Sequence, residues 1–328
     1  MPSGHWQSRP IQRIDIHHHY FEATLDKANA SKKVGWLTPA ENLPWSPQVS
    51  LKYMDAHGID VAILSFPAIS SGSISTENRE KTRQRNLAMA EICRTHPTRF
   101  GFFATLPFLR DVEGALAEIA FALDELGADG ISLSSCYGEG DDAVYIGDDL
   151  FDAIWRELNH RRTVVFLHGA QTPSSTPYPH PFLGIPVTEV PGETFKAAAH
   201  LVVSGRKRKY PNTKIILAHL GGSTPFLAAR VAALSAHMGC ELSPEQVIQD
   251  FQTFYFESAL SAHPTTLRLM QSFVGPERIL FGTDFPAVSA ETAGWYTKHL
   301  EDFYRDNKPD LEAITLDNAL QLFRKHPD

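Results

Sequence analysis

The sequence has few cysteines, no long apolar run and no excess of basic residues. Its three cysteines, Cys93, Cys136 and Cys240, are far apart and form no CxxC pair, which argues against a disulfide framework or a cysteine-based zinc site. No stretch approaches the roughly 18 apolar residues of a membrane span. The segment 1–10 is too polar for a secretory signal. We therefore expect a cytoplasmic protein that does not contact a membrane.

Acidic residues outnumber basic ones, with 38 Asp and Glu against 30 Lys and Arg and a formal net charge of −8. Nucleic-acid binding needs a basic surface. The one short basic cluster, Arg206–Lys209, lies between apolar segments, where we expect a solvated helix end. The sequence therefore predicts no nucleic-acid partner, and its 43% of hydrophobic residues is ample for a large core.

What the sequence does contain is an alternation of β-rich and helical segments along the whole chain. Short apolar runs predict eight strands, over residues 11–16, 61–66, 100–106, 130–133, 164–168, 214–218, 253–256 and 278–282. Helical periodicity predicts helices over residues 76–96, 112–126, 149–161, 192–204, 225–236, 264–273 and 310–325. Such an alternation is typical of a parallel sheet.

Eight βα units in a chain of this length fit a (β/α)8 TIM barrel, here treated as a single domain over residues 1–328. A doubly wound nucleotide-binding sheet is disfavoured because no glycine-rich phosphate loop follows the first strand. Two segments rich in Pro, Ser and aromatic residues, at about 20–50 and 169–191, follow strand ends. We expect them to be insertion loops on the active-site face of the barrel.

Polar residues follow several of the predicted strands. His17 and His19 end the first strand and point the same way, since side chains alternate along a strand, while His18 faces the helix layer. His168, His219 and Asp284 end the fifth, sixth and eighth strands. Each of these could be a structural residue with a hydrogen-bond partner or a helix cap. Together, on one face of a barrel, they predict a metal site.

These strand ends resemble the amidohydrolase superfamily of metal-dependent barrels. The chain is most similar to the branch that contains aminocarboxymuconate-semialdehyde decarboxylase and the nonoxidative aromatic-acid decarboxylases. The likeness runs from Ile14 to about Phe323 and is carried by IDIHHH at 14–19, MDAHGI at 54–59, RFGFFATLP at 99–107, AHLGGSTPF at 218–226 and LFGTDFP at 280–286.

The resemblance implies one divalent ion, zinc or manganese, held by His17, His19, His168 and Asp284, with His219 as the catalytic histidine beside it. Superfamily members that bind two metals use a carboxylated lysine at the end of the fourth strand. That strand reads GISLS at 130–134 and has no lysine, so we expect a single metal.

The resemblance also implies substrate contacts. Arg230 matches an arginine that, in the semialdehyde decarboxylase, reaches the substrate carboxylate across a dimer interface, which predicts a homodimer; a surface arginine with a local ion pair is the alternative. A second family arginine is missing, because residues 37–44 before Trp45 contain no Arg or Lys, and this favours a substrate with one carboxylate. Four aromatic residues could line an apolar pocket for the substrate ring or simply pack: Trp45, Phe66, Phe182 and Phe285.

The activity implied is metal-dependent, nonoxidative decarboxylation of a hydroxylated aromatic acid, without an organic cofactor. Residues 17–20 and 100–107 are most similar to decarboxylases of fungal polyketide pathways that convert 6-methylsalicylate to 3-methylphenol and CO2. Asp284 would return a proton to the ring carbon, and His219 would hydrogen-bond the substrate or relay protons. The alternatives are hydrolysis of a lactone or amide by the same ligands, and a barrel that binds without catalysis.

Overall fold

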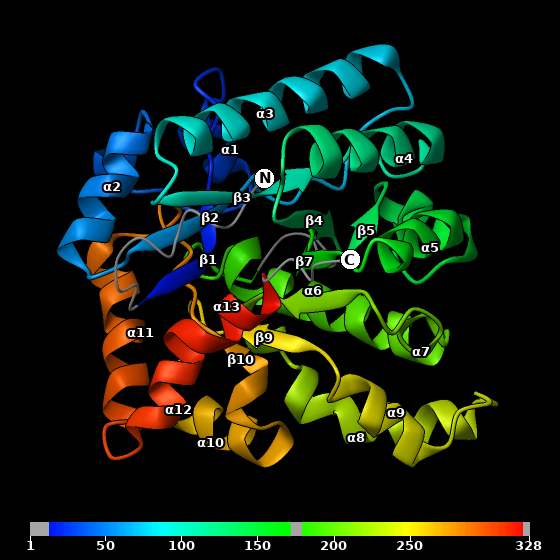
Figure 1. Ribbon diagram of the computed structural model, residues 1–328. Coiled ribbons are helices and arrows are strands. Elements are labelled where there is room, and N and C mark those ends of the chain that lie inside the picture. Colours follow the sequence, from blue (N-terminus) through cyan, green and yellow to red (C-terminus); the bar gives the residue numbers. More distant parts are fainter. Residues whose placement is uncertain (1–12, 172–178, 324–328) are drawn as a thin grey trace.

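Eight parallel strands close into a barrel in the computed structural model, which describes residues 13–171 and 179–323 (Figure 1). In chain order the strands are β1 (Ile14–His19), β2 (Val61–Ser65), β3 (Phe100–Thr105), β4 (Gly130–Ser134), β7 (Val164–His168), β8 (Lys214–Leu217), β9 (Tyr255–Glu257) and β10 (Ile279–Leu280). Each strand pairs with the next in this order. The barrel closes where the amides of Ile16 and His19 donate to the carbonyls of Phe281 and Phe285, at 3.0 and 2.8 Å. The predicted TIM barrel is confirmed.

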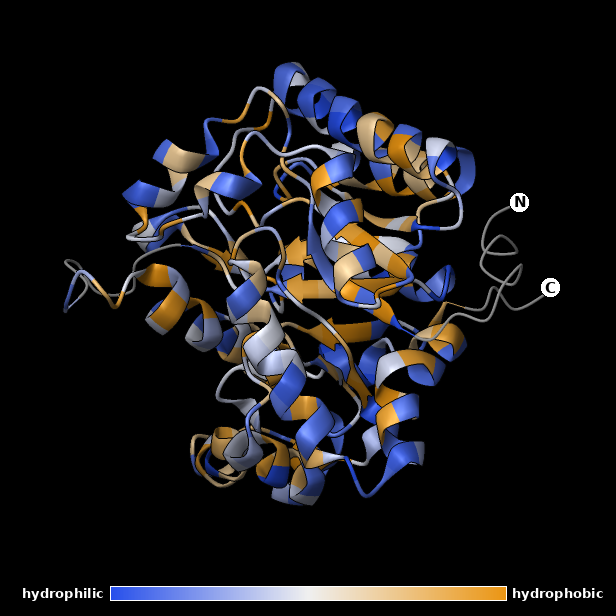
Figure 2. Ribbon diagram, turned by 90° about the vertical axis from the view of Figure 1, so that its left-hand side faces the viewer, coloured by the Kyte–Doolittle hydropathy of each residue, from blue (hydrophilic) through white to orange (hydrophobic). Residues whose placement is uncertain are grey.

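The strands are buried on both faces, as a parallel sheet covered by helices requires. One apolar cluster, which includes Ile16, Ile63, Phe103 and Phe166, fills the barrel interior. A larger cluster packs between the strands and the surrounding helices. Figure 2 shows the apolar strands at the centre, behind helices with one apolar and one polar side. The strand ends therefore stand on a rigid scaffold.

Helices surround the barrel (Figure 1). They are α1 (Lys27–Lys33), α2 (Pro47–Ala56), α3 (Thr76–Thr95), α4 (Val112–Ala120), α5 (Asp152–His160), α6 (Ile185–Val203), α7 (Arg206–Lys209), α8 (Thr224–His237), α9 (Pro244–Phe251), α10 (Pro264–Phe273), α11 (Ala290–Phe303), α12 (Lys308–Glu312) and α13 (Asn318–Leu322). A small hairpin, β5 (Cys136–Tyr137) with β6 (Val144–Tyr145), follows β4. Among the helices of the described residues, none is both long enough and apolar enough to cross a membrane.

The two segments expected to be insertion loops follow β1 and β7, but both contain helix. Segment 20–50 holds α1 and the start of α2, and α6 begins at Ile185 rather than at residue 192. Pro47 and Pro186 lie in the first turns of α2 and α6, where a missing amide hydrogen costs nothing. Residues 172–178 lie outside the described residues, as do 11 and 12 of the first predicted strand and 324 and 325 of the last predicted helix.

We expected the basic cluster Arg206–Lys209 to be a solvated helix end. It forms the separate helix α7, in which Arg208 and Lys209 are exposed but Arg206 and Lys207 are buried. Arg206 Nη1 lies 3.0 Å from Asp152, and Lys207 Nζ lies 5.2 Å from the ring centre of Phe254. Both partners are distant in the sequence. The local pattern of charges therefore could not reveal that these two cations are buried.

Candidate metal centre and active site

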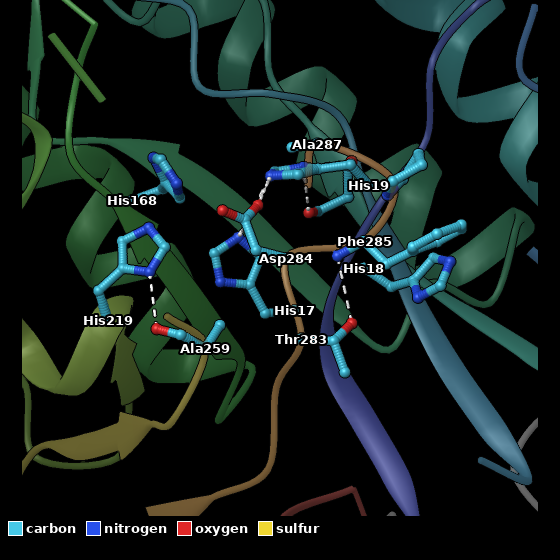
Figure 3. A network of polar contacts seen from close by, with 12 residues as sticks. His17, His18, His19, His168, His219, Ala259, Thr283, Asp284, Phe285 and Ala287 are labelled. Carbon is cyan, nitrogen blue, oxygen red and sulfur yellow. Dashed lines mark hydrogen bonds and ion pairs between the residues drawn. The ribbon is translucent and has the colours of Figure 1, made fainter. Parts of the chain in front are cut away.

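Four histidines and one aspartate meet at the carboxyl ends of β1, β7, β8 and β10 (Figure 3). His17 and His19 share one side of β1, with their Nε2 atoms 3.2 Å apart. The ring centre of His168, the last residue of β7, is 5.3 Å from that of His17 and 5.2 Å from that of His219. Asp284 Oδ1 lies 2.9 Å from His19 Nε2 and 3.3 Å from His17 Nε2. The structure thus brings together all five residues that the sequence singled out.

His18 points away from this cluster, as the alternation along β1 predicts. Its Nδ1 lies 2.9 Å from Asp15 Oδ2, and its Nε2 lies 2.8 Å from the Ser50 hydroxyl on α2. Asp15 also accepts a hydrogen bond of 2.6 Å from the Thr283 hydroxyl. His18 and Asp15 therefore fix β1 and the segment before Asp284 relative to one another.

Each of the four clustered imidazoles uses its Nδ1 atom for a hydrogen bond to an oxygen. The pairs are His17 with Glu257 Oε1 at 2.8 Å, His19 with the Ser65 carbonyl at 3.3 Å, His168 with the Gly169 carbonyl at 2.8 Å and His219 with the Ala259 carbonyl at 3.0 Å. Carbonyl and carboxylate oxygens accept hydrogen bonds, so each Nδ1 carries the hydrogen. Each Nε2 atom therefore keeps its lone pair.

This donor set fits a divalent cation. The facing lone pairs of His17 and His19 would repel each other without a positive charge nearby, and among the described residues the buried Asp284 Oδ1 has no hydrogen-bond partner. Two overlapping groups, His17 with His19 and His168, and His17 with His219 and Asp284, each place one ligand atom per residue within 4.8 Å of the others. Imidazole nitrogens and a carboxylate oxygen are common ligands of zinc, and they also suit other divalent metals.

The protonation states of these groups suit a metal ion. Burial lowers the pKa of His17 and of His168 well below the usual value. Burial by itself would raise the pKa of Asp284, but His17 and His19 outweigh it and hold that pKa below its usual range. Metal binding requires a neutral imidazole and an ionised carboxylate.

A cavity of about 240 Å³ opens at this cluster and is bordered by His19, His168, His219 and Asp284. Much of its remaining wall is apolar and comes from the two segments that follow β1 and β7, with Val34 and Trp36 from the first, and Val187 and Val190 from the second. An apolar cavity with a few converging polar groups is typical of a small-molecule site.

The sequence matches the profile of the amidohydrolase family over residues 14–325. The chain belongs to the amidohydrolase family. A decarboxylase of Penicillium terrestre is 37% identical over 95% of both chains. The 6-methylsalicylic acid decarboxylase of Penicillium expansum is 34% identical, over 95% of this chain and 96% of its own. A dihydroxybenzoic acid decarboxylase from Polaromonas, solved with bound manganese and the inhibitor 2-nitroresorcinol, is 26% identical with a TM-score of 0.80, over 96% of this chain and 97% of its own.

In this amidohydrolase, Glu257 is a site residue that the sequence analysis missed. It ends β9 and is fully buried, and besides His17 it accepts the amide hydrogens of His219 at 2.5 Å and Ala259 at 2.6 Å. Burial raises the pKa of Glu257 to about 7. A Cβ atom at Gly282 would collide with the Glu257 carboxylate and with Cβ of His17. The available signal was its position, directly after the predicted strand 253–256.

Two predicted substrate contacts of the amidohydrolase, Trp45 and Phe285, are packed elsewhere and are absent from the described residues that line the cavity. Trp45 Nε1 donates to the Ser50 hydroxyl at 3.0 Å. Phe285 stacks on Tyr53, with the ring centres 3.9 Å apart and the planes 3° from parallel. These tertiary partners determine where both rings lie.

Phe66 and Phe182, which the sequence analysis also considered for the pocket wall, are likewise absent from the described residues that line the cavity. Phe66 borders a different cavity, described below, and Phe182 is 84% exposed.

Arg230 of the amidohydrolase lies on the exposed side of α8 and does not line the cavity of its own chain. Within the described residues it has neither an ion pair nor a side-chain hydrogen bond, so the alternative of a local ion pair is not observed. Phe226 on the same helix and Met238, the residue directly after that helix, are 75% and 82% exposed. Any role of Arg230 in catalysis therefore requires a second subunit.

Proposed function

We propose that this amidohydrolase is a metal-dependent, nonoxidative decarboxylase of hydroxylated aromatic acids, in which His17, His19, His168 and Asp284 hold one divalent ion, zinc or manganese. The observation that carries this proposal is the convergence of imidazole lone pairs and Asp284 at an apolar cavity. The same ligands could hydrolyse a lactone or amide. The decarboxylases among the relatives, at 34% and 37% identity, favour decarboxylation instead.

We further propose 6-methylsalicylate as the substrate, with 3-methylphenol and CO2 as products. The similarity to the Penicillium expansum enzyme supports this choice. The apolar side chains of Val34, Val187 and Val190 in the cavity wall suit an aromatic ring with a methyl substituent.

A bound divalent ion would supply the positive charge that orients the carboxylate and ortho hydroxyl of the acid and stabilises phenolate charge. Loss of CO2 leaves an electron pair on the ring carbon, which must take up a proton. Asp284 accepts the hydroxyl proton of the substrate and returns it to that carbon. His219, whose Nδ1 hydrogen is held by the Ala259 carbonyl, offers Nε2 as a hydrogen-bond acceptor to the substrate. The apolar walls exclude water while uncharged CO2 leaves.

The test begins with metal analysis of the purified protein, followed by removal of the metal with a chelator and reloading with zinc or manganese. Each form is then assayed for CO2 release from salicylate, 6-methylsalicylate and 2,6-dihydroxybenzoate, with an aromatic lactone as the control for hydrolysis. We expect CO2 release that disappears on chelation and returns with metal. Ring opening of the lactone without CO2 release from any acid would contradict the proposal.

We also propose that the protein is a cytoplasmic homodimer in which Arg230 approaches the active site of the partner subunit. The three free cysteines are consistent with a reducing compartment. The unpaired Arg230 between the exposed Phe226 and Met238 supports an interface on α8.

Mixing two inactive variants tests the shared site. Subunits with His17→Ala and subunits with Arg230→Ala are purified separately and then exchanged. Native mass spectrometry, which resolves the small mass differences between the two homodimers and the mixed dimer, verifies the exchange. If Arg230 acts across the interface, one site of each mixed dimer has an intact metal shell and an intact arginine, so part of the activity returns. A fully active monomer, or no recovery in verified mixed dimers, would exclude this arrangement.

A further inference from the structure

Lys27 is the one Lys or Arg among the described residues that line the active-site cavity. It is the first residue of α1, in the segment that follows β1, and it is half-buried. Within the described residues, no carboxylate oxygen lies within 4.0 Å of its ammonium nitrogen. A partly desolvated cation without a carboxylate partner is costly, so the cavity favours an anionic ligand.

Lys27 is connected to the metal-site histidines through one aromatic ring. Its Nζ atom lies 4.7 Å from the ring centre of Phe21. The Phe21 ring is within 16° of parallel to the imidazole of His19, at a centre-to-centre distance of 6.1 Å. Burial lowers the pKa of Lys27 while the charge of Asp284 raises it, so the ammonium lies within the electrostatic field of the cluster. Lys27 and the cluster of His19, His168, His219 and Asp284 thus border the same small cavity.

The positions where family resemblance would place a cation for the substrate carboxylate do not supply one within this chain. Residues 37–44 contain no Arg or Lys. Arg230 is on the outer side of α8, away from the cavity of its own subunit. For an aromatic acid entering a protein with a formal charge of −8, Lys27 adds a positive charge from within the same subunit, besides the proposed metal ion and the proposed contact from the second subunit.

We propose that Lys27 binds the carboxylate of the substrate and makes this cavity select aromatic acids over the neutral phenols that decarboxylation produces. The identity of the acid rests on the proposed function above. The contact exists only before CO2 leaves, so it strengthens substrate binding and lets the phenol dissociate. It is a ground-state contact, which affects KM rather than kcat.

Direct binding measurements test the selectivity. The dissociation constants of 6-methylsalicylate and of 3-methylphenol are measured by calorimetry at low temperature with the manganese-loaded protein, and again with the metal-free protein. Lys27→Met keeps an unbranched side chain and removes the charge, Lys27→Arg keeps the charge, and Lys33→Met removes a charge from the exposed side of the same helix. Circular dichroism verifies the fold of each variant.

We expect Lys27→Met to bind the acid roughly 10- to 100-fold more weakly, the usual contribution of a charged hydrogen bond. It should bind the phenol within about twofold of wild type, because the phenol has no carboxylate. Lys27→Arg should retain most of the affinity for the acid, and Lys33→Met should match wild type. Equal weakening for acid and phenol, or unchanged binding of the acid, would overturn the proposal.

Steady-state kinetics separate this inference from the proposed function. Lys27→Met should raise KM for the acid and leave kcat within a few-fold of wild type. A large fall in kcat with unchanged KM would contradict a ground-state role. If wild type releases no CO2 from any acid but binds acids in a Lys27-dependent way, the decarboxylase proposal fails and this one stands. If wild type decarboxylates and Lys27→Met binds the acid normally, this inference alone fails.

Discussion

The two sides of the barrel mouth differ in what their strands present. On one side β1, β7 and the segments after β8 and β10 present imidazoles and a carboxylate that converge at one point. On the other side β2, β3 and β4 end in Ser65, Thr105 and Ser134, and the last two border a second cavity of about 190 Å³. The contrast is sharpest between neighbours, because Ser134 of β4 is the register partner of His168 of β7.

The charges at the second cavity are already neutralised or solvated. Arg85 borders it, but its guanidinium makes two hydrogen bonds to Glu22, at 2.9 and 3.1 Å, and lies 4.0 Å from the ring centre of Phe66. Lys81 is exposed to solvent. A strand-end position in a barrel therefore does not by itself make a reactive site. Several buried ligand atoms must point at one volume without other partners, as they do around Asp284.

The largest effect should follow removal of a metal ligand. His17→Ala should abolish decarboxylation and lower the bound metal, and Asp284→Ala should also abolish activity, since each contributes to one shared ion. Metal content by elemental analysis and CO2 release are the measurements. His160→Ala, an exposed histidine at the end of α5, is the matched control and should behave as wild type. Full metal content and turnover in His17→Ala would refute the ligand assignment.

The next largest effect should follow substitution of His219, which we propose contacts the substrate rather than binds the metal ion. His219→Ala should keep its metal and lose about 10²- to 10⁴-fold in turnover, the range for a residue that transfers or orients a proton. Elemental analysis and single-turnover rates distinguish these outcomes. Loss of metal comparable to that in His17→Ala would make His219 a ligand, a placement that its proximity to His17 and Asp284 also permits.

A substitution of Glu257 should have a smaller effect on metal binding, because Glu257 acts by orienting His17. In Glu257→Gln, the amide can accept from His17 Nδ1 or from the amide of Ala259, but its NH2 group then faces the other donor. We expect a metal affinity about 10- to 100-fold lower, as for other residues that orient a metal-bound histidine. Competition with a chelator measures it. Glu118→Gln, a buried carboxylate on α4 paired with Arg83, is the control and should leave metal affinity unchanged.

The fold and the cluster of histidines with Asp284 were predictable because their signals are local. Each strand is a short apolar run, and His17, His19, His168 and Asp284 are polar residues directly after such runs. The match to the amidohydrolase family over residues 14–325 confirms the superfamily that the sequence motifs indicated. The carboxylate of Glu257 has the same local signal, but its role depends on His17, which is 240 residues away.

The walls of the cavity could not be predicted in the same way. Aromatic rings such as Trp45 and Phe285 contact whatever the tertiary structure places beside them, here Ser50 and Tyr53. Helix α1 is only seven residues long and has no strong apolar periodicity, so neither the helix nor the position of Lys27 was visible in the sequence.

The smallest effect is expected from a substitution at Ser134, on the side of the barrel mouth where β2, β3 and β4 end. Its hydroxyl is buried without a hydrogen-bond partner among the described residues, so Ser134→Ala removes an unsatisfied polar group and no contact. We expect metal content and turnover like those of wild type, and a free energy of unfolding within about 0.5 kcal/mol of it or slightly higher. Urea unfolding and the CO2 assay measure both. Because Ser134 is aligned with His168, a loss of metal in this variant would extend the site onto β4 and erase the difference between the two sides of the barrel mouth.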